Sequence, residues 1–125
     1  YDTIAANEVR YEDYLTEDAD IVLVAYGITA RIAKSAVNAC RKAGIKAGLM
    51  RPITLWPFPE KHLAELAGKT RAFLTVELSM GQMVNDVRLA VENRVPVHFY
   101  GRTGGMMPSV DEVAAEIVKI HENLN

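Results

Sequence analysis

The chain has 125 residues, of which 50% are hydrophobic and 24% are charged, and its net charge at pH 7 is −2. This balance is typical of a globular domain with its own core and excludes a disordered chain. The weakly acidic charge favours neither nucleic acid nor an anionic membrane as a partner. The longest apolar run, residues 21–26, is too short to cross a bilayer.

Acidic residues are concentrated at the N-terminus. Residues 1–20 hold seven acids and one base, a charge of −6, while the remainder carries +4. We interpret this segment as an acidic lead-in, either solvated or used for docking. Within it, Tyr11, Tyr14 and Leu15 fit a helix face or a short edge strand equally well. The single cysteine, Cys40, excludes an internal disulfide and favours a reducing compartment, the cytoplasm.

The core elements begin with residues 21–26, a continuous apolar run that predicts a strand buried on both faces. Thr29 is the expected N-cap of the helix that follows, and Gly44 is its expected end. The apolar stripe of this helix comprises Ile32, Ala33, Ala36, Val37 and Cys40. A second strand is predicted at about 46–50, and a rigid loop over 51–59 contains three prolines.

The rest of the chain repeats the strand–helix alternation. The remaining expected elements are a helix over 59–67, a strand over 72–76, a helix over 83–91, a strand over 97–100 and a final helix that starts with a Ser109–Glu112 capping box. Apolar strands that alternate with helices predict a three-layer α/β/α fold with a parallel sheet of four strands, or of four to five if the N-terminal segment adds an edge strand. Residues 21–125 would form this core.

No complete catalytic site is visible in the sequence. Ligands of such sheets bind beyond the carboxyl ends of the strands, but no dinucleotide or nucleotide-phosphate fingerprint follows any predicted strand. We therefore expect neither catalytic residues nor a metal site in this chain. His62 is expected to be exposed, His98 to be a hydrogen-bonded structural residue, and His121 to lie in the last helical turn. Cys40 is expected to be a buried, inert thiol.

A glycine-rich loop over residues 101–109 is the strongest local feature. Gly101, Arg102, Gly104 and Gly105 precede a capped helix, so they are weak candidates for binding an anion. The alternative, which we favour, is a turn that packs against a neighbouring domain. Arg51 and Glu77 end neighbouring strands, and we expect them to form a salt bridge at the rim of the sheet.

Four motifs resemble one family in their order along the chain. They are YLTEDADIVLVAYG at 14–27, RPITLWPFP at 51–59, VELSMGQ at 76–82 and YGRTGG at 100–105. Together they resemble the transketolase C-terminal-type domain of the alpha subunit of 2-oxoacid:ferredoxin oxidoreductases, closest to the 2-oxoisovalerate or 2-oxoglutarate branch. Family members often have asparagine where this chain has Ser79. The resemblance implies a mixed sheet with one antiparallel strand, which would make the segment around Tyr11 an edge strand.

The resemblance also implies an activity for the whole enzyme: a 2-oxoacid, CoA and oxidised ferredoxin give an acyl-CoA, carbon dioxide and reduced ferredoxin. Thiamine diphosphate and iron–sulfur clusters would be held in other domains or subunits, and this chain would bind neither by itself. The expected partners are the rest of the alpha subunit, a beta subunit, a small ferredoxin-like subunit and ferredoxin; self-association is a further expectation. Arg51, Trp56, Glu77 and Gln82 are expected to make contacts between domains.

We therefore expect residues 1–125 to be a single domain, cut from a longer alpha subunit, with a structural and subunit-docking role and no activity in isolation. The start at Tyr1, rather than at methionine, agrees with this expectation. The alternative function is a stand-alone anion- or CoA-binding module that uses the loop over 101–109.

Overall fold

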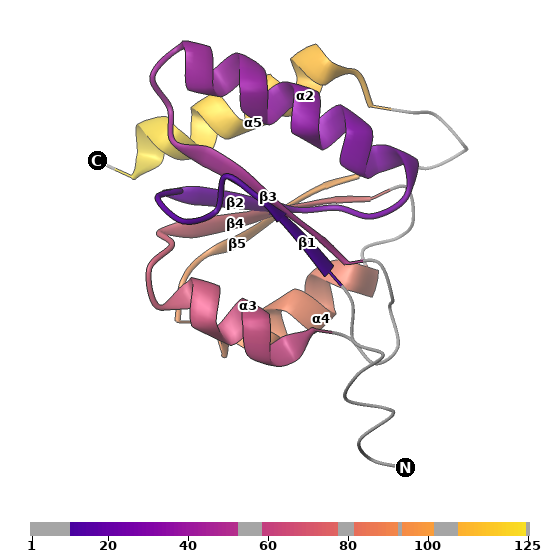
Figure 1. The fold of residues 1–125 in the computed structure, drawn as a ribbon, viewed down its shortest axis with the longest axis vertical. Helices are drawn as coiled ribbons and strands as arrows, with labels where there is room; N and C mark the ends of the chain where they lie inside the picture. The colour runs from indigo at the N-terminus through magenta and orange to yellow at the C-terminus, as the bar shows by residue number, and fades with distance from the viewer. Residues whose placement is uncertain (1–10, 53–58, 78–81, 93, 102–107, 125) are drawn as a thin grey trace.

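The computed structural model describes residues 11–52, 59–77, 82–92, 94–101 and 108–124 (Figure 1). Its elements are β1 (Tyr11–Tyr14), β2 (Ile21–Val24), α2 (Ile28–Lys42), β3 (Ala47–Pro52), α3 (Glu60–Ala67), β4 (Ala72–Glu77), α4 (Gln82–Val91), β5 (Val97–Gly101) and α5 (Val110–Asn123). In the part of the chain covered by these ranges, no helix has the length and apolar character needed to span a membrane.

The five strands form one mixed sheet in the order β1-β3-β2-β4-β5. Strands β2 to β5 are parallel to one another, and β1 pairs antiparallel with β3 at the edge, with Tyr14 opposite Leu49. In the centre, Leu23 of β2 is in register with Leu49 on one side and Leu74 on the other. The predicted fold class is confirmed, and the ambiguous segment around Tyr11 is an edge strand.

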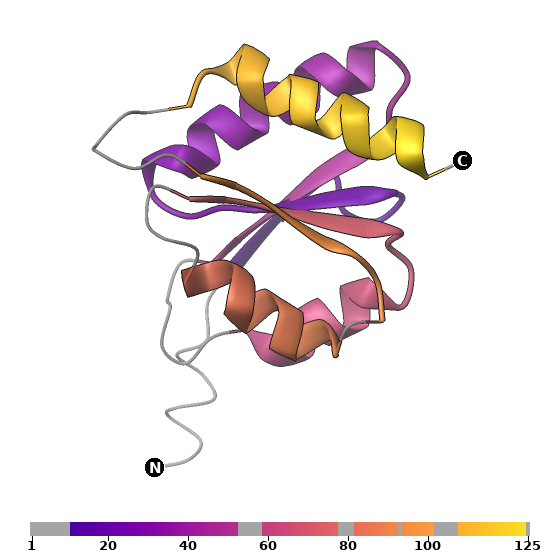
Figure 2. The ribbon, with the colours of Figure 1, turned by 180° about the vertical axis from the view of Figure 1, so that it is seen from behind.

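Two helices cover each face of the sheet. Figures 1 and 2 show α2 and α5 on one face and α3 and α4 on the other. Because side chains alternate along a strand, β2 contributes to both cores: Ile21 and Leu23 pack under α2 and α5, whereas Val22 and Val24 pack over α3 and α4. All four residues of β2 are buried, as the continuous apolar run predicts.

The start of α2 differs from the prediction that Thr29 is its N-cap. The helix begins at Ile28, two residues earlier than an N-cap at Thr29 implies, and its N-cap is Gly27, with φ 63. The Thr29 hydroxyl donates a hydrogen bond of 2.6 Å back to the carbonyl oxygen of Tyr26. The positive φ explains the difference, because glycine adopts this conformation without the steric cost that other residues incur.

Strand β5 is the other edge of the sheet, and it is less buried than the central strands. His98 and Phe99 are exposed, while Val97 and Tyr100 are half-buried and pack against opposite cores. The expectation of a hydrogen-bonded structural role for His98 is therefore wrong. The sequence pattern is that of a buried strand, but β5 has a strand neighbour on one side only, which leaves part of its surface in solvent.

Candidate functional site

The carboxyl ends of β2 and β4 meet at the point where the sheet order changes direction. From β2 the chain passes through α2 to β3, which lies on one side of β2. From β3 it passes through α3 to β4, which lies on the other side of β2. Such switch points commonly hold ligands in α/β sheets. Here the cavity has a volume of about 130 Å³ and is lined by Tyr26, Gly27, Ile28, Thr29 and Glu77. This volume is below the roughly 300–1,000 Å³ of typical ligand pockets.

Glu77, which ends β4, has its carboxylate inside the fold. It is 1% exposed, and its Oε1 and Oε2 accept hydrogen bonds of 3.3 and 3.2 Å from the backbone N–H groups of Met83 and Val84. A carboxylate suits this position, because the N-terminus of α4 presents unsatisfied donors and a partial positive charge. Glu77 therefore anchors α4 to the end of β4.

Arg51, near the end of β3, points to the edge of the sheet. Its Nη1 donates a 3.0 Å hydrogen bond to Oε1 of Glu12 on β1, and the two side chains are 45% and 61% exposed. The predicted pair between Arg51 and Glu77 is wrong. It fails because antiparallel pairing of β1 with β3 places Glu12 directly opposite Arg51. The sequence alone does not show that residues 11–14 form this strand.

Several predicted site residues lie outside the described part of the chain. They are Trp56, Arg102, Gly104 and Gly105, together with the side chain of Gln82. Gly101 is described, and it ends β5 opposite Glu77. A Cβ atom at Gly101 would collide with the Phe99 ring and lie 3.0 Å from the carbonyl oxygen of Glu77, so the ring and the paired strand together leave no room for a side chain.

The N-terminus of α5 is already capped by the chain. Oγ of Ser109 accepts a 3.1 Å hydrogen bond from the Glu112 N–H, and Oε1 of Glu112 accepts one of 3.1 Å from the Ser109 N–H. The predicted capping box is therefore confirmed. It places a carboxylate where the predicted anion loop needs free donors, so it does not favour binding of an anion there.

His62 makes contacts that the sequence did not indicate. Its Nε2 lies 2.7 Å from Oδ2 of Asp13, and its ring stacks on Tyr11 with the ring centroids 4.0 Å apart. The side chain is 16% exposed, so the expectation of an exposed histidine is wrong. These contacts join α3 to the edge strand β1, and no local sequence signal reveals them because His62 and Asp13 are 49 residues apart.

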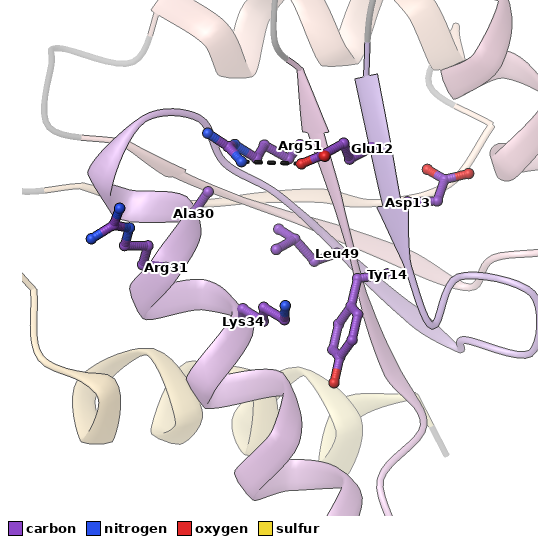
Figure 3. Close-up of a pocket in the computed structure, with 8 residues that line it drawn as sticks. All are labelled: Glu12, Asp13, Tyr14, Ala30, Arg31, Lys34, Leu49 and Arg51. Atoms are coloured by element: carbon purple, nitrogen blue, oxygen red, sulfur yellow. Dashed lines mark hydrogen bonds and ion pairs between the residues drawn. The ribbon is translucent and has the colours of Figure 1, made fainter.

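A second cavity, of about 560 Å³, lies between α2 and the β1–β3 edge. Figure 3 shows Lys34 of α2 pointing toward Tyr14 of β1, with the Arg51–Glu12 pair near Leu49. The wall from α2 is formed by Ala30, Arg31 and Lys34. No sequence signal indicates this cavity, because its walls meet only once β1 is placed beside β3.

Metal and thiol chemistry find no support in the described ranges. No group of three or more histidine, cysteine, aspartate or glutamate residues there is arranged to hold a metal ion. Cys40 is 3% exposed, and burial raises the pKa of its thiol. The prediction of a buried thiol is confirmed.

Two solved structures share the fold of this chain. A 2-oxoglutarate:ferredoxin oxidoreductase from Magnetococcus marinus, solved with 2-oxoglutarate, coenzyme A and succinyl-CoA, matches 99% of this chain and 21% of its own, with a TM-score of 0.80 and 18% identity. A split-gene transketolase, solved as an inactive beta4 tetramer, matches 88% of this chain and 40% of its own, with a TM-score of 0.75 and 26% identity. The predicted transketolase-like fold is confirmed.

Relatives found by sequence are more similar to this chain than these solved structures are. The ketoisovalerate oxidoreductase subunit VorB of Methanothermobacter marburgensis is 48% identical over 120 residues, which are 96% of this chain. The chain spans about a third of that relative, 34% of its length. The family model of the pyruvate:ferredoxin oxidoreductase core domain II matches residues 19–113, which cover β2 to the first turns of α5. The chain therefore belongs to the pyruvate:ferredoxin oxidoreductase core domain II family.

Proposed function

We propose that this chain is a domain of the alpha subunit of a 2-oxoacid:ferredoxin oxidoreductase, and that the whole enzyme converts ketoisovalerate, CoA and oxidised ferredoxin into the acyl-CoA, carbon dioxide and reduced ferredoxin. The observation that carries this proposal is the 48% identity to a ketoisovalerate oxidoreductase subunit over 96% of the chain. Residues 1–125 would form one domain of that subunit, and 2-oxoglutarate is the alternative substrate.

The role of this domain would be to hold other parts of the enzyme in place. The chain has a single cysteine, which is too few to ligate an iron–sulfur cluster, and that cysteine is buried. The clusters would therefore be bound by other domains or subunits, and we propose that thiamine diphosphate is held there as well. Arg51 is suited to docking, since an exposed ion pair contributes little stability and its arginine can exchange Glu12 for a carboxylate on a partner.

The partners would be the rest of the alpha subunit, a beta subunit, a small ferredoxin-like subunit and ferredoxin, with CoA as co-substrate. Trp56 and Gln82 would join Arg51 at the contact between domains. The buried carboxylate of Glu77 would instead act from inside the fold, by anchoring α4 to the carboxyl end of β4. We place the enzyme in the cytoplasm, since a reducing compartment suits a free thiol.

The test is turnover by the assembled enzyme. The complete alpha subunit that carries this domain should be purified with its beta and ferredoxin-like subunits, and reduction of methyl viologen measured with ketoisovalerate and CoA. We expect reduction that requires both substrates, a higher kcat/KM for ketoisovalerate than for 2-oxoglutarate, and no turnover by the 125-residue chain alone. Absence of turnover with every branched or dicarboxylic 2-oxoacid would contradict the proposal.

A further inference from the structure

The cavity between α2 and the β1–β3 edge has the size of a small-molecule site. Its volume of about 560 Å³ falls within the roughly 300–1,000 Å³ found for ligand pockets. Ala30 and Leu49 contribute apolar surface, and polar side chains from three elements surround it (Figure 3). These elements are the first turns of α2 and the paired strands β1 and β3.

Positive charge dominates the helical wall of this cavity. The whole of α2 carries Arg31, Lys34, Arg41 and Lys42 and no acidic residue. Arg31 and Lys34 are exposed and line the cavity, and in the described ranges neither forms an ion pair with a carboxylate. The cavity therefore presents two cationic groups that no carboxylate pairs with directly.

The two carboxylates that line the cavity are already engaged. Glu12 accepts the hydrogen bond from Arg51, and Asp13 bonds His62 on α3. The opposite wall is also held in place: the Tyr14 hydroxyl donates to Oδ1 of Asn38 at 2.6 Å. The Lys34 ammonium lies 4.7 Å from the centre of the Tyr14 ring, which fixes its position by a cation–π contact.

We propose that this cavity binds a small organic anion that carries at least two carboxylate or phosphate groups. Two cations without an ion-pair partner, Arg31 and Lys34, match two negative charges, and a guanidinium and an ammonium are the side chains that bind such groups most strongly. Nonspecific electrostatic attraction to the protein would not account for binding of an anion, because the chain as a whole has a net charge of −2. The inference goes beyond the proposed oxidoreductase function, and direct binding tests it without turnover.

The experiment is titration calorimetry of the 125-residue chain at pH 7 and constant ionic strength. Citrate represents the carboxylate class, inorganic pyrophosphate the phosphate class, and acetate is the singly charged control. We expect citrate or pyrophosphate to bind and acetate not to bind. Tighter binding of citrate would indicate a carboxylate ligand, and tighter binding of pyrophosphate a phosphate ligand. The Arg31→Gln and Lys34→Gln variants should each weaken binding by about tenfold, since charge-assisted hydrogen bonds are lost.

The matched control is Lys42→Gln, which removes the same charge from the same helix outside the cavity. It should change affinity by less than about twofold, because exposed charges at a distance are screened. A second variant, Glu12→Gln, frees Arg51 from its carboxylate and should strengthen binding by several fold. A misfolded variant would lose affinity, so stronger binding by Glu12→Gln cannot result from a failure to fold.

Two results would overturn the proposal. The first is that neither citrate nor pyrophosphate binds to the unmodified chain. The second is that Lys42→Gln weakens binding as much as Arg31→Gln does, which would assign the effect to the general charge of α2. Thermal unfolding followed by circular dichroism verifies that each variant is folded before its affinity is compared.

Discussion

The guanidinium of Arg41 holds the segment that connects β1 to β2. Arg41 of α2 donates to the carbonyl oxygens of Leu15 and Ala47 at 2.8 Å each, and it forms a two-pronged ion pair with Asp18. Leu15 has a φ of 57, a conformation that non-glycine residues seldom adopt. The hydrogen bonds from Arg41 help to hold that strained turn.

This ion pair makes one contribution to stability dependent on pH. The hydrogen bond from Arg41 lowers the pKa of Asp18 below its ordinary value of 3.8. A lowered pKa in the folded state means that the stabilisation is present above pH 3.8 and is lost as the pH falls through the folded pKa. Urea unfolding should therefore show Asp18→Asn less stable than the unmodified chain at pH 7, with a smaller difference at lower pH.

The control for this prediction is Asp86→Asn, which removes an exposed carboxylate from α4. Its stability difference from the unmodified chain should not follow the pattern of Asp18→Asn. A stability difference for Asp18→Asn that stays constant from pH 7 to pH 2 would contradict the role assigned to Arg41.

Gly48 of β3 lies directly beneath the same turn. A Cβ atom at this position would be 2.6 Å from the carbonyl oxygen of Leu15 and 3.1 Å from Cβ of Ala19. Since backbone blocks the space, we expect Gly48→Ala to lower the free energy of unfolding by roughly 1–3 kcal/mol, as overpacking does. Chemical denaturation measures this loss.

Gly68, at the end of α3, provides the comparison. Its backbone is in the right-handed helical region, and a Cβ atom there would be 3.4 Å from the nearest atom. Gly68→Ala should therefore leave stability unchanged or raise it by up to about 1 kcal/mol, since alanine restricts the unfolded chain. Equal losses in both variants would refute the steric argument for Gly48.

At the scale of elements, the packing of α2 against α5 closes one face of the sheet. Small residues allow the helices to approach, and Sγ of Cys40 lies 3.8 Å from the carbonyl oxygen of Ala114. Val37 and Ile117 are fully buried in the same core. Cys40 therefore becomes accessible only if these two helices separate or the chain unfolds.

This packing predicts the reactivity of the thiol. Because Cys40 is buried and its pKa is raised, an aromatic disulfide reagent should modify it slowly in the native chain and rapidly in urea. The control is Ser35→Cys in a Cys40→Ala background, which places a thiol on the exposed face of α2. Rapid modification of native Cys40, equal to that of the control thiol, would contradict the assigned packing.

For the whole molecule, the central strands and the covering helices were predictable from the sequence. The run over 21–26 is short, apolar at every position and rich in β-branched residues, which is typical of a strand between two helical layers. The Ser109–Glu112 pair is a local signal that needs no tertiary contact. Strand β1 was not predictable from its own pattern. Its four residues are largely exposed, so periodicity carries little information about them.

The functional features divide in the same way. The sequence by itself determined the alternation of strands and helices, the burial of Cys40 and the lack of cysteine ligands for a cluster, because these properties depend on residue type and on spacing within one element. Only the tertiary structure decided the partners of Arg51, His62 and Glu77 and the cavity beside α2. Each of these depends on where an edge strand or a helix end lies in space, and residues distant in sequence contribute to it.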